Sequence, residues 1–227
     1  MRACPGCTFN VLQSACYGLN KEAGYESVFQ HAFMNLIIFD LETTGLLPSQ
    51  HEIIQIAAMK VKNGKWSEGE YFDSYVRPEN HIPSFITKLT GISQAQVANA
   101  PHPTDVLMEF TRFVGHDATL IAHNGIRFDM RFIAEHCKRH GMPVRETSAL
   151  DSRDFSRKIW GGKGGHGLDA VLGRVGVSSK GVKRHDARVD VQLLAQAVQY
   201  MWERLTSSVT NCPVALSAGV IPALDRV

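Results

Sequence analysis

Four acidic side chains and one histidine carry most of the chemistry in this sequence, and they lie in three short motifs. Asp40 and Glu42 belong to FDLETTG, Asp129 to HNGIRFD, and His185 and Asp190 to HDARVD. Each acid lies beside a turn or at the end of an apolar run, where an ionised carboxylate is costly unless a cation or hydrogen bonds neutralise it. Together the motifs predict a hydrolase that uses two divalent metal ions to cleave phosphodiester bonds.

The spacing within the motifs supports a shared metal site. Asp40 and Glu42 are two residues apart, so on a strand both carboxylates project from the same face. Such a pair raises the pKa of one carboxyl unless a cation neutralises it. His185 lies five residues before Asp190, at the entry to a predicted helix. Each group has an ordinary reading when considered singly, such as helix capping by Asp129 or a solvated surface histidine, but five in this order predict one site.

The remaining sequence predicts the elements that position these motifs. The run NLIIFD at 35–40 predicts a buried central strand, and 52–62 and 71–77 predict two antiparallel strands joined by a hairpin turn at Asn63-Gly64. Further strands are predicted at 118–124 and 146–150, and helices at 84–93, 104–114, 126–140, 153–160, 168–175 and 186–205. An antiparallel meander followed by parallel strands with crossover helices predicts an α/β fold: a ribonuclease-H-like mixed sheet of about five strands with helices on both faces.

Length and composition favour one enzyme domain inside the cell. The 227 residues accommodate one domain at 35–205, preceded by an extension of uncertain structure at 1–34 and followed by a loose tail at 206–227. No apolar run approaches the roughly 20 residues that cross a bilayer, so no membrane association is expected. The five cysteines are odd in number and mostly terminal, which favours an intracellular, reducing compartment such as cytoplasm or nucleus. The net charge of +2 does not by itself identify a polyanionic partner.

The three motifs, in this order, resemble those of the DEDDh (DnaQ-like) 3′–5′ exonucleases, the family that includes the proofreading ε subunit of bacterial DNA polymerase III, ribonuclease T and oligoribonuclease. The resemblance covers residues 35–204 and extends to LTGI and GHGLDAVLGRVGV between the motifs. It implies release of nucleoside 5′-monophosphates from nucleic-acid 3′ ends. Similarity to the ε-type domains favours DNA over RNA, preferably single-stranded or frayed ends, and a role in proofreading or repair.

The resemblance also implies a role for each residue. Asp40 would bridge two Mg²⁺ or Mn²⁺ ions, Glu42 and Asp190 would complete the site of the nucleophilic water, Asp129 would support the second ion, and His185 would deprotonate the water. The implied contacts to the terminal nucleotide are Thr43, Thr44, Gly45, Leu46, Leu89, Ile92, His123 and Asn124. The basic residues near the motifs that are candidates for upstream phosphates are Arg127, Arg131, Lys163, Lys183, Arg184 and Arg188.

Two alternatives remain open at this level. The first is an exoribonuclease or an oligoribonuclease-like enzyme, because two-metal chemistry does not distinguish the sugars and discrimination depends on the surroundings of the 2′-hydroxyl. The second is a non-catalytic nucleic-acid-binding or polymerase-docking module on the same fold. All five catalytic-type groups are present, which favours an enzyme. Association with a polymerase or with a second copy of the chain is compatible with either reading.

Overall fold

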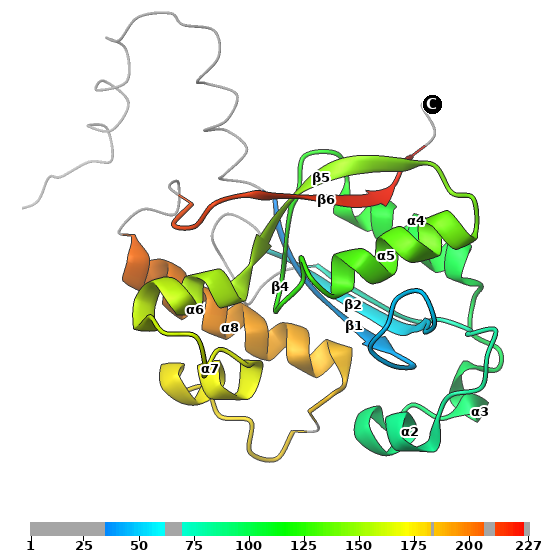
Figure 1. The fold of residues 1–227 in the computed structure, drawn as a ribbon, viewed down its shortest axis with the longest axis horizontal. Helices are drawn as coiled ribbons and strands as arrows, with labels where there is room; N and C mark the ends of the chain where they lie inside the picture. The colour runs from blue at the N-terminus through cyan, green and yellow to red at the C-terminus, as the bar shows by residue number, and fades with distance from the viewer. Residues whose placement is uncertain (1–34, 62–69, 183, 207–211, 225–227) are drawn as a thin grey trace, which may run out of the picture.

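Six strands form one mixed sheet at the centre of the molecule (Figure 1). The computed structural model describes residues 35–61, 70–182, 184–206 and 212–224. The strands are β1 (Leu36–Thr43), β2 (Ile53–Val61), β3 (Tyr71–Tyr75), β4 (Thr119–Ala122), β5 (Val144–Asp151) and β6 (Ser217–Pro222), in the spatial order β3-β2-β1-β4-β5-β6. β1, β4 and β5 are parallel, whereas β2, β3 and β6 join by antiparallel pairing. The ribonuclease-H-like mixed sheet is confirmed, with one strand more than expected.

Helices cover both faces of the sheet, and each face has its own core. On one face, α4 (Pro103–Val114) and α5 (Asp129–Arg139) pack against the strands through residues such as Phe110 and Phe132. On the other face lie α6 (Ser152–Trp160), α7 (Leu168–Val175) and α8 (Ala187–Leu205), which contribute Phe155, Leu172 and Leu194. The two groups of helices are separated by the strands in Figure 1. The crossover helices predicted from the sequence therefore form the two outer layers.

The apolar run of β1 is buried on both faces, as its sequence predicts. Phe39 and Leu41 join the core under α4 and α5, and the Phe39 ring lies 5.7 Å from that of Phe110, centroid to centroid. Ile38 joins the core under α8. Because side chains alternate along a strand, Asp40 and Glu42 project on the α8 side of the sheet. The strand thus delivers the first motif toward the helix that carries the third.

A small helical lobe lies beside the start of β2 and contains α2 (Ser84–Thr90) and α3 (Gln94–Val97). Ile86 and Ile92 bury their side chains there against Ile54 of β2. α3 was not predicted as a separate helix because it is one turn long. Its start is marked by a capping box, in which Gln96 N–H donates to the Ser93 hydroxyl and the Gln96 side chain accepts from Ser93 N–H.

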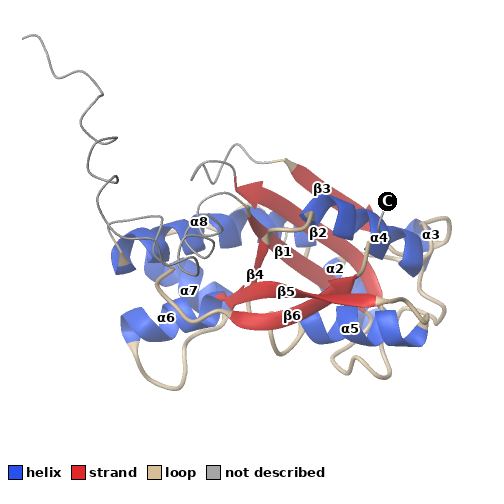
Figure 2. Cartoon of the chain, turned by 90° about the horizontal axis from the view of Figure 1, so that it is seen from above, coloured by secondary structure: helices blue, strands red, loops and turns tan. Residues whose placement is uncertain are grey.

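The tail expected at 206–227 is not loose throughout. Ser217–Pro222 forms β6, which pairs antiparallel with β5 and lies beside it at the edge of the sheet (Figure 2). Gly219 packs closely against α5, where an added Cβ would lie 2.3 Å from the terminal Cε of the flexible Met130 side chain. The segment is short and lacks a clear alternation of apolar and polar residues, so its sequence does not predict a strand. The strand is stabilised by its pairing with β5. The extension at 1–34 and the Asn63-Gly64 turn lie outside the described residues.

Candidate active site

The acidic pair of the first motif lies at the carboxyl end of β1, on the side facing α8. Glu42 is buried and Asp40 is half-buried. Burial and the nearby carboxylates of Asp129 and Glu42 raise the pKa of Asp40 well above its usual value, and only Arg184 acts in the opposite direction. A strand end with this much negative charge favours a bound cation.

Asp129 of the second motif joins the first motif directly. β4 ends at Ala122, and Asp129 opens α5. The carboxylate of Asp129 accepts a hydrogen bond from the N–H of Leu41 at 3.2 Å and another from its own backbone N–H at the start of α5. Burial raises the pKa of Asp129 to about 7, although backbone hydrogen bonds act in the opposite direction. Asp129 therefore bonds to the start of its own helix and also contacts β1.

His185 and Asp190 of the third motif complete the cluster. Glu42, His185 and Asp190 each offer one ligand atom, and these atoms all lie within 4.8 Å of one another. Asp186 caps α8, and His185 N–H donates to Asp190 Oδ2 at 3.2 Å. His185 has a φ of 60°, which non-glycine residues seldom adopt and which recurs at functional sites. The loop before α8 thus places the imidazole beside the carboxylates.

Arg184 enters the cluster from the same loop. Its Nη1 forms an ion pair with Asp190 Oδ1, and its Nε donates to Asp169 Oδ1 of α7 at 2.9 Å. Burial and the positive charge of Arg184 lower the pKa of His185. Arg184 was predicted to contact phosphates, but its guanidinium here supplies positive charge to the acidic site.

The donor set fits hard divalent cations. Glu42 and Asp190 offer carboxylate oxygens within reach of one ion, and Asp40 and Asp129 add two more carboxylates. Burial, and for Asp40 also the neighbouring carboxylates, raises the pKa of Asp40 and of Asp129, so their ionised forms are costly without a cation. Oxygen-rich sites of this kind suit Mg²⁺ and Mn²⁺ better than zinc. These four carboxylates are the residues that would hold the ions.

The turn after β1 holds three residues predicted to contact substrate. The Thr43 hydroxyl donates to Gly45 O at 2.6 Å, and the Thr44 hydroxyl accepts from Glu52 N–H at 2.9 Å. A Cβ on Gly45 would lie 2.2 Å from the His51 ring, so glycine is required for the turn to close against His51. Both threonines are buried, and their side chains shape the turn.

The apolar residues predicted at the substrate divide into two groups. Leu46 is 78% exposed and Leu89 is 47% exposed, so both are accessible to a nucleotide. Ile92 is 3% exposed and packs in the lobe core. The stacking role expected for Ile92 is therefore not supported, because its side chain is covered by its own lobe.

His123 and Asn124 are tied into a polar network at the ends of β4 and β5. His123 Nδ1 lies 2.8 Å from Ser152 Oγ, and Asn124 N–H donates to Asp151 Oδ1 at 2.9 Å. Arg153 Nη1 donates to Asn124 Oδ1 at 2.7 Å. Burial and Arg153 lower the pKa of His123 to about 4, so it is neutral at pH 7. The sequence analysis missed Asp151, although an acid at the end of an apolar strand was the available signal.

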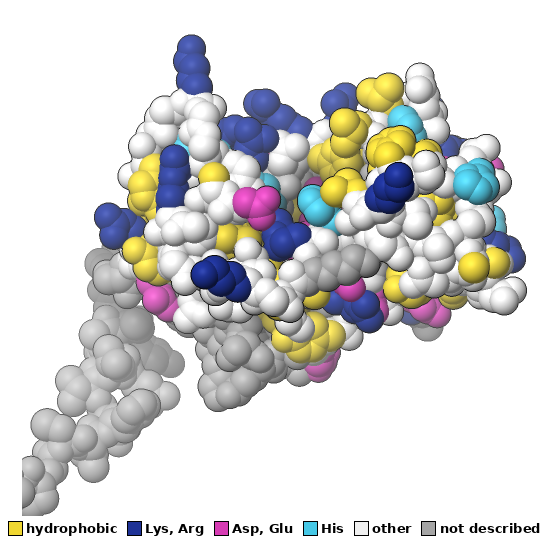
Figure 3. Space-filling view, turned by 90° about the horizontal axis from the view of Figure 1, so that it is seen from below, with side chains coloured by type: hydrophobic (Ala, Val, Ile, Leu, Met, Phe, Trp, Pro, Cys, Tyr) yellow, Lys and Arg dark blue, Asp and Glu magenta, His cyan; other side chains and the backbone are white. Residues whose placement is uncertain are grey.

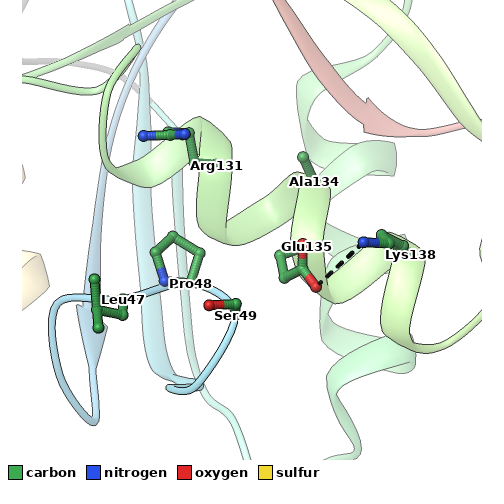
Figure 4. Close-up of a pocket in the computed structure, with 7 residues that line it drawn as sticks. All are labelled: Leu47, Pro48, Ser49, Arg131, Ala134, Glu135 and Lys138. Carbon is green, nitrogen blue, oxygen red and sulfur yellow. Dashed lines mark ion pairs between the residues drawn. The ribbon is translucent and has the colours of Figure 1, made fainter.

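Of the predicted phosphate contacts, Arg131 lies closest to a defined cavity. A cavity of about 430 Å³ lies between the 47–49 turn and α5, and Arg131 and Lys138 line it (Figure 4). Arg188 is instead bound to Asp186 through two hydrogen bonds, and Lys183 lies outside the described residues. Lys and Arg side chains also surround the molecular face on which α2 and α7 lie (Figure 3).

Gln55 is a site residue that sequence analysis missed. It is 1% exposed on β2. Its side chain accepts from Ala187 N–H at 3.3 Å and donates to Asp73 Oδ1 at 2.9 Å. Gln55 therefore anchors the start of α8, the helix that carries Asp190. The single polar residue inside the run IIQIAA was the signal.

Comparison with known proteins identifies the family. The model of the exonuclease family RNase_T matches residues 37–198. A DNA polymerase III subunit epsilon-like protein of Rhodobacter capsulatus is 37% identical over 165 residues, which are 72% of this chain and 23% of that protein. A PolC-type DNA polymerase III of Caldanaerobacter subterraneus is 38% identical over 169 residues, or 74% of this chain and 12% of that protein. The chain spans less than a quarter of the length of these relatives.

Solved structures agree with this result. Exonuclease X in complex with 5′-overhanging duplex DNA gives a TM-score of 0.59 at 25% identity, covering 74% of this chain and 92% of that one. The nuclease domain of 3′hExo, a DEDDh family member bound to rAMP, gives a TM-score of 0.69 at 20% identity, covering 82% and 96%. The sheet order, the acidic cluster and these matches lead to one conclusion: the chain belongs to the DnaQ-like exonuclease family.

Proposed function

We propose that this chain is a metal-dependent 3′–5′ exonuclease that releases nucleoside 5′-monophosphates from the 3′ end of DNA, preferably from single-stranded or frayed ends. The observation that carries the proposal is the convergence of Glu42, His185 and Asp190 within 4.8 Å, beside Asp40 and Asp129. Three motifs far apart in the sequence supply this one cluster.

The residues act by holding ions, a water and the scissile phosphate. Asp40, Glu42, Asp129 and Asp190 would hold two divalent cations, which would supply Lewis-acid stabilisation of the attacking and leaving oxygens. His185 takes the proton of the attacking water, because its lowered pKa keeps the imidazole unprotonated at neutral pH. Arg184, which pairs with Asp190, places a positive charge beside the carboxylates that would hold the ions.

The terminal nucleotide lies against the turn after β1. Thr43, Thr44 and Gly45 form a compact turn whose conformation Glu52 and His51 enforce. Exposed Leu46 and Leu89 supply apolar surface against which a base can stack. Upstream phosphates extend toward basic side chains such as Arg131, which lines the cavity beside the 47–49 turn.

DNA is proposed as the substrate because the curated relatives are named as DNA polymerase III proteins and exonuclease X was solved with duplex DNA. Those names also make docking to a polymerase, and a role in proofreading or repair, part of the proposal.

No helix in the described part of the chain is long and apolar enough to span a bilayer.

The experiment is a degradation assay on matched DNA and RNA oligonucleotides, single-stranded and duplex, labelled at the 3′ or the 5′ end. The expected result is immediate release of labelled mononucleotide from 3′-labelled DNA and a stepwise ladder from 5′-labelled DNA, in Mg²⁺ or Mn²⁺ but not in EDTA. Faster loss of RNA would replace DNA by RNA in the proposal. No cleavage of any oligonucleotide would favour a binding module.

A further inference from the structure

A second group of metal-ligating side chains lies at the other end of α5 from the acidic cluster. Glu79, His102 and His140 each offer one ligand atom, and these atoms all lie within 4.8 Å of one another. Glu79 lies in the loop after β3, His102 caps the start of α4, and His140 caps the end of α5. The 11 residues of α5 place His140 about 16 Å from Asp129 at the usual helical rise. The two groups cannot share an ion.

We propose that Glu79, His102 and His140 bind a zinc ion, with water as the fourth ligand. Two imidazoles and one carboxylate are a donor set that zinc adopts with three protein ligands. The nitrogen donors also distinguish this site from the carboxylate-rich cluster, which suits Mg²⁺ or Mn²⁺. Tetrahedral zinc with bonds of about 2.0–2.2 Å holds its donors about 3.3 Å apart, so the side chains need to close by about 1.5 Å at most. Glu79 is exposed and can rotate to supply that movement.

The His102 ring is already oriented for metal binding. Its Nδ1 lies 2.8 Å from the hydroxyl of Thr104 and accepts a hydrogen bond from Thr104 N–H at 3.4 Å as the cap of α4, so Nε2 is the ring nitrogen available to an ion. While Nδ1 acts as the cap acceptor, Nε2 of the neutral ring carries the proton, so zinc binding at Nε2 requires the proton to move to Nδ1, where the Thr104 hydroxyl can accept it. Thr104 therefore acts as the residue that positions His102.

His140 faces His102 across the group. The two rings meet edge to face with centroids 5.1 Å apart. His136, the next histidine on the same helix face, is not a ligand because its Nε2 accepts a hydrogen bond from Ile53 N–H at 3.0 Å.

The Glu79 loop is held in place by the buried carboxylate of Glu52. The N–H groups of Glu79 and Asn80 donate to its two oxygens, each at 2.9 Å. Glu52 is also bonded through its own N–H to Thr44 in the turn after β1. A zinc ion at this site would link the loop after β3 to the start of α4 and the end of α5. It would thereby stabilise the loop whose N–H groups bind the Glu52 carboxylate.

The test uses the full chain carrying Asp40→Asn and Asp190→Asn, which weaken ion binding in the acidic cluster. Zn²⁺ binding is measured by calorimetry, and Co²⁺ is added separately to read ligand geometry from its visible absorption. Cys4 and Cys7 can also bind zinc. Zn²⁺ binding and Tm are therefore compared between this protein and the same protein with one of the three proposed ligands replaced. We expect a Zn²⁺-dependent rise in Tm and the intense visible bands of four-coordinate Co²⁺.

The ligand variants are Glu79→Gln, His102→Asn and His140→Gln. Asparagine at 102 keeps a helix-capping side chain, and Glu79→Gln changes an exposed side chain, so at least one variant retains the fold. Each variant should weaken Zn²⁺ binding at least tenfold and abolish the rise in Tm, whereas His116→Asn, at an exposed histidine elsewhere, should change neither. The site would be overturned if folded Glu79→Gln and His140→Gln proteins bound Zn²⁺ as tightly as the protein in which all three ligands are intact. Because the acidic cluster is disabled throughout, this outcome is independent of the exonuclease assay.

Discussion

The carboxylate of Asp129 accepts a hydrogen bond from the N–H of Leu41, the residue between Asp40 and Glu42. This contact joins the first turn of α5 to the end of β1 and sets the second motif against the first. Placing the carboxylate there has an electrostatic cost, because burial disfavours its ionised form and raises the pKa of Asp129 to about 7. The site is therefore held in a conformation that favours either a proton or a cation.

Asp129→Asn should make stability less sensitive to pH. A folded-state pKa above the unfolded value means that the native state favours protonated Asp129; this stabilisation is present below about pH 4 and is lost as pH rises through about 7. Relative to the variant, the wild type should lose roughly 1–3 kcal/mol of unfolding free energy across that range. Urea denaturation in EDTA measures this change. Parallel pH profiles would contradict the electrostatic account, and Asp105→Asn, exposed in the first turn of α4, is the matched control.

Arg184→Gln should strengthen binding of Mn²⁺. The guanidinium pairs with Asp190, so an incoming cation must displace it from a ligand. Removal of this competitor should lower the Mn²⁺ concentration for half-maximal thermal stabilisation by roughly three- to tenfold. Arg157→Gln, which alters a pair with Asp154 on α6, should leave that concentration unchanged. Weaker Mn²⁺ binding by Arg184→Gln would show that the arginine supports the site.

His185→Gln should lower kcat by roughly 10²- to 10⁴-fold with little change in KM, because a general base acts on the water rather than on substrate binding. The lowered pKa of His185 should also keep the wild type active below the usual pH of histidine titration, because the base stays unprotonated there. Steady-state kcat and KM measured from pH 5 to 8 test both points, because histidines usually titrate within this range of about three pH units. A higher KM at unchanged kcat would assign His185 to substrate binding instead.

Gln55→Leu should affect the site without touching an ion. The substitution leaves Ala187 N–H without its partner at the start of α8 and should cost roughly 1–3 kcal/mol of stability. Because Asp190 lies in the first turn of α8, kcat should fall as well. Gln192→Leu, on the exposed face of the same helix, is the control that should change neither. Unaltered stability and kcat in Gln55→Leu would show that α8 is positioned by its core packing alone.

The sequence predicted the elements best where apolar periodicity agreed with flanking residues that typically begin or end a helix. The helix predicted at 168–175 has those bounds as α7, and the long final helix begins one residue later than expected, at Ala187. Strand β1 could be predicted because a strand buried on both faces requires a continuous apolar run. β6 could not, because its backbone hydrogen bonds to β5 carry no trace in its own side chains.

The candidate site was predictable in its residue types but not in its contacts. Motif order indicated that Asp40, Asp129 and Asp190 converge. The hydrogen bond from Leu41 to Asp129 and the ion pair of Arg184 with Asp190 depend on backbone direction in loops, which residue type does not determine. For the same reason Ile92 was assigned to the substrate surface, although its lobe buries it.

The most direct test of the account is the rate of 5′-mononucleotide release from a 3′-labelled single-stranded DNA by wild type and Asp190→Asn, each verified as folded, in Mn²⁺. Asparagine keeps the size of the side chain while removing the charge that joins Glu42 and His185 at the candidate metal site. We predict a loss of at least about a thousandfold in the variant, the scale expected when metal-assisted chemistry is removed. Comparable rates in the two proteins would contradict the placement of the active site at the end of β1.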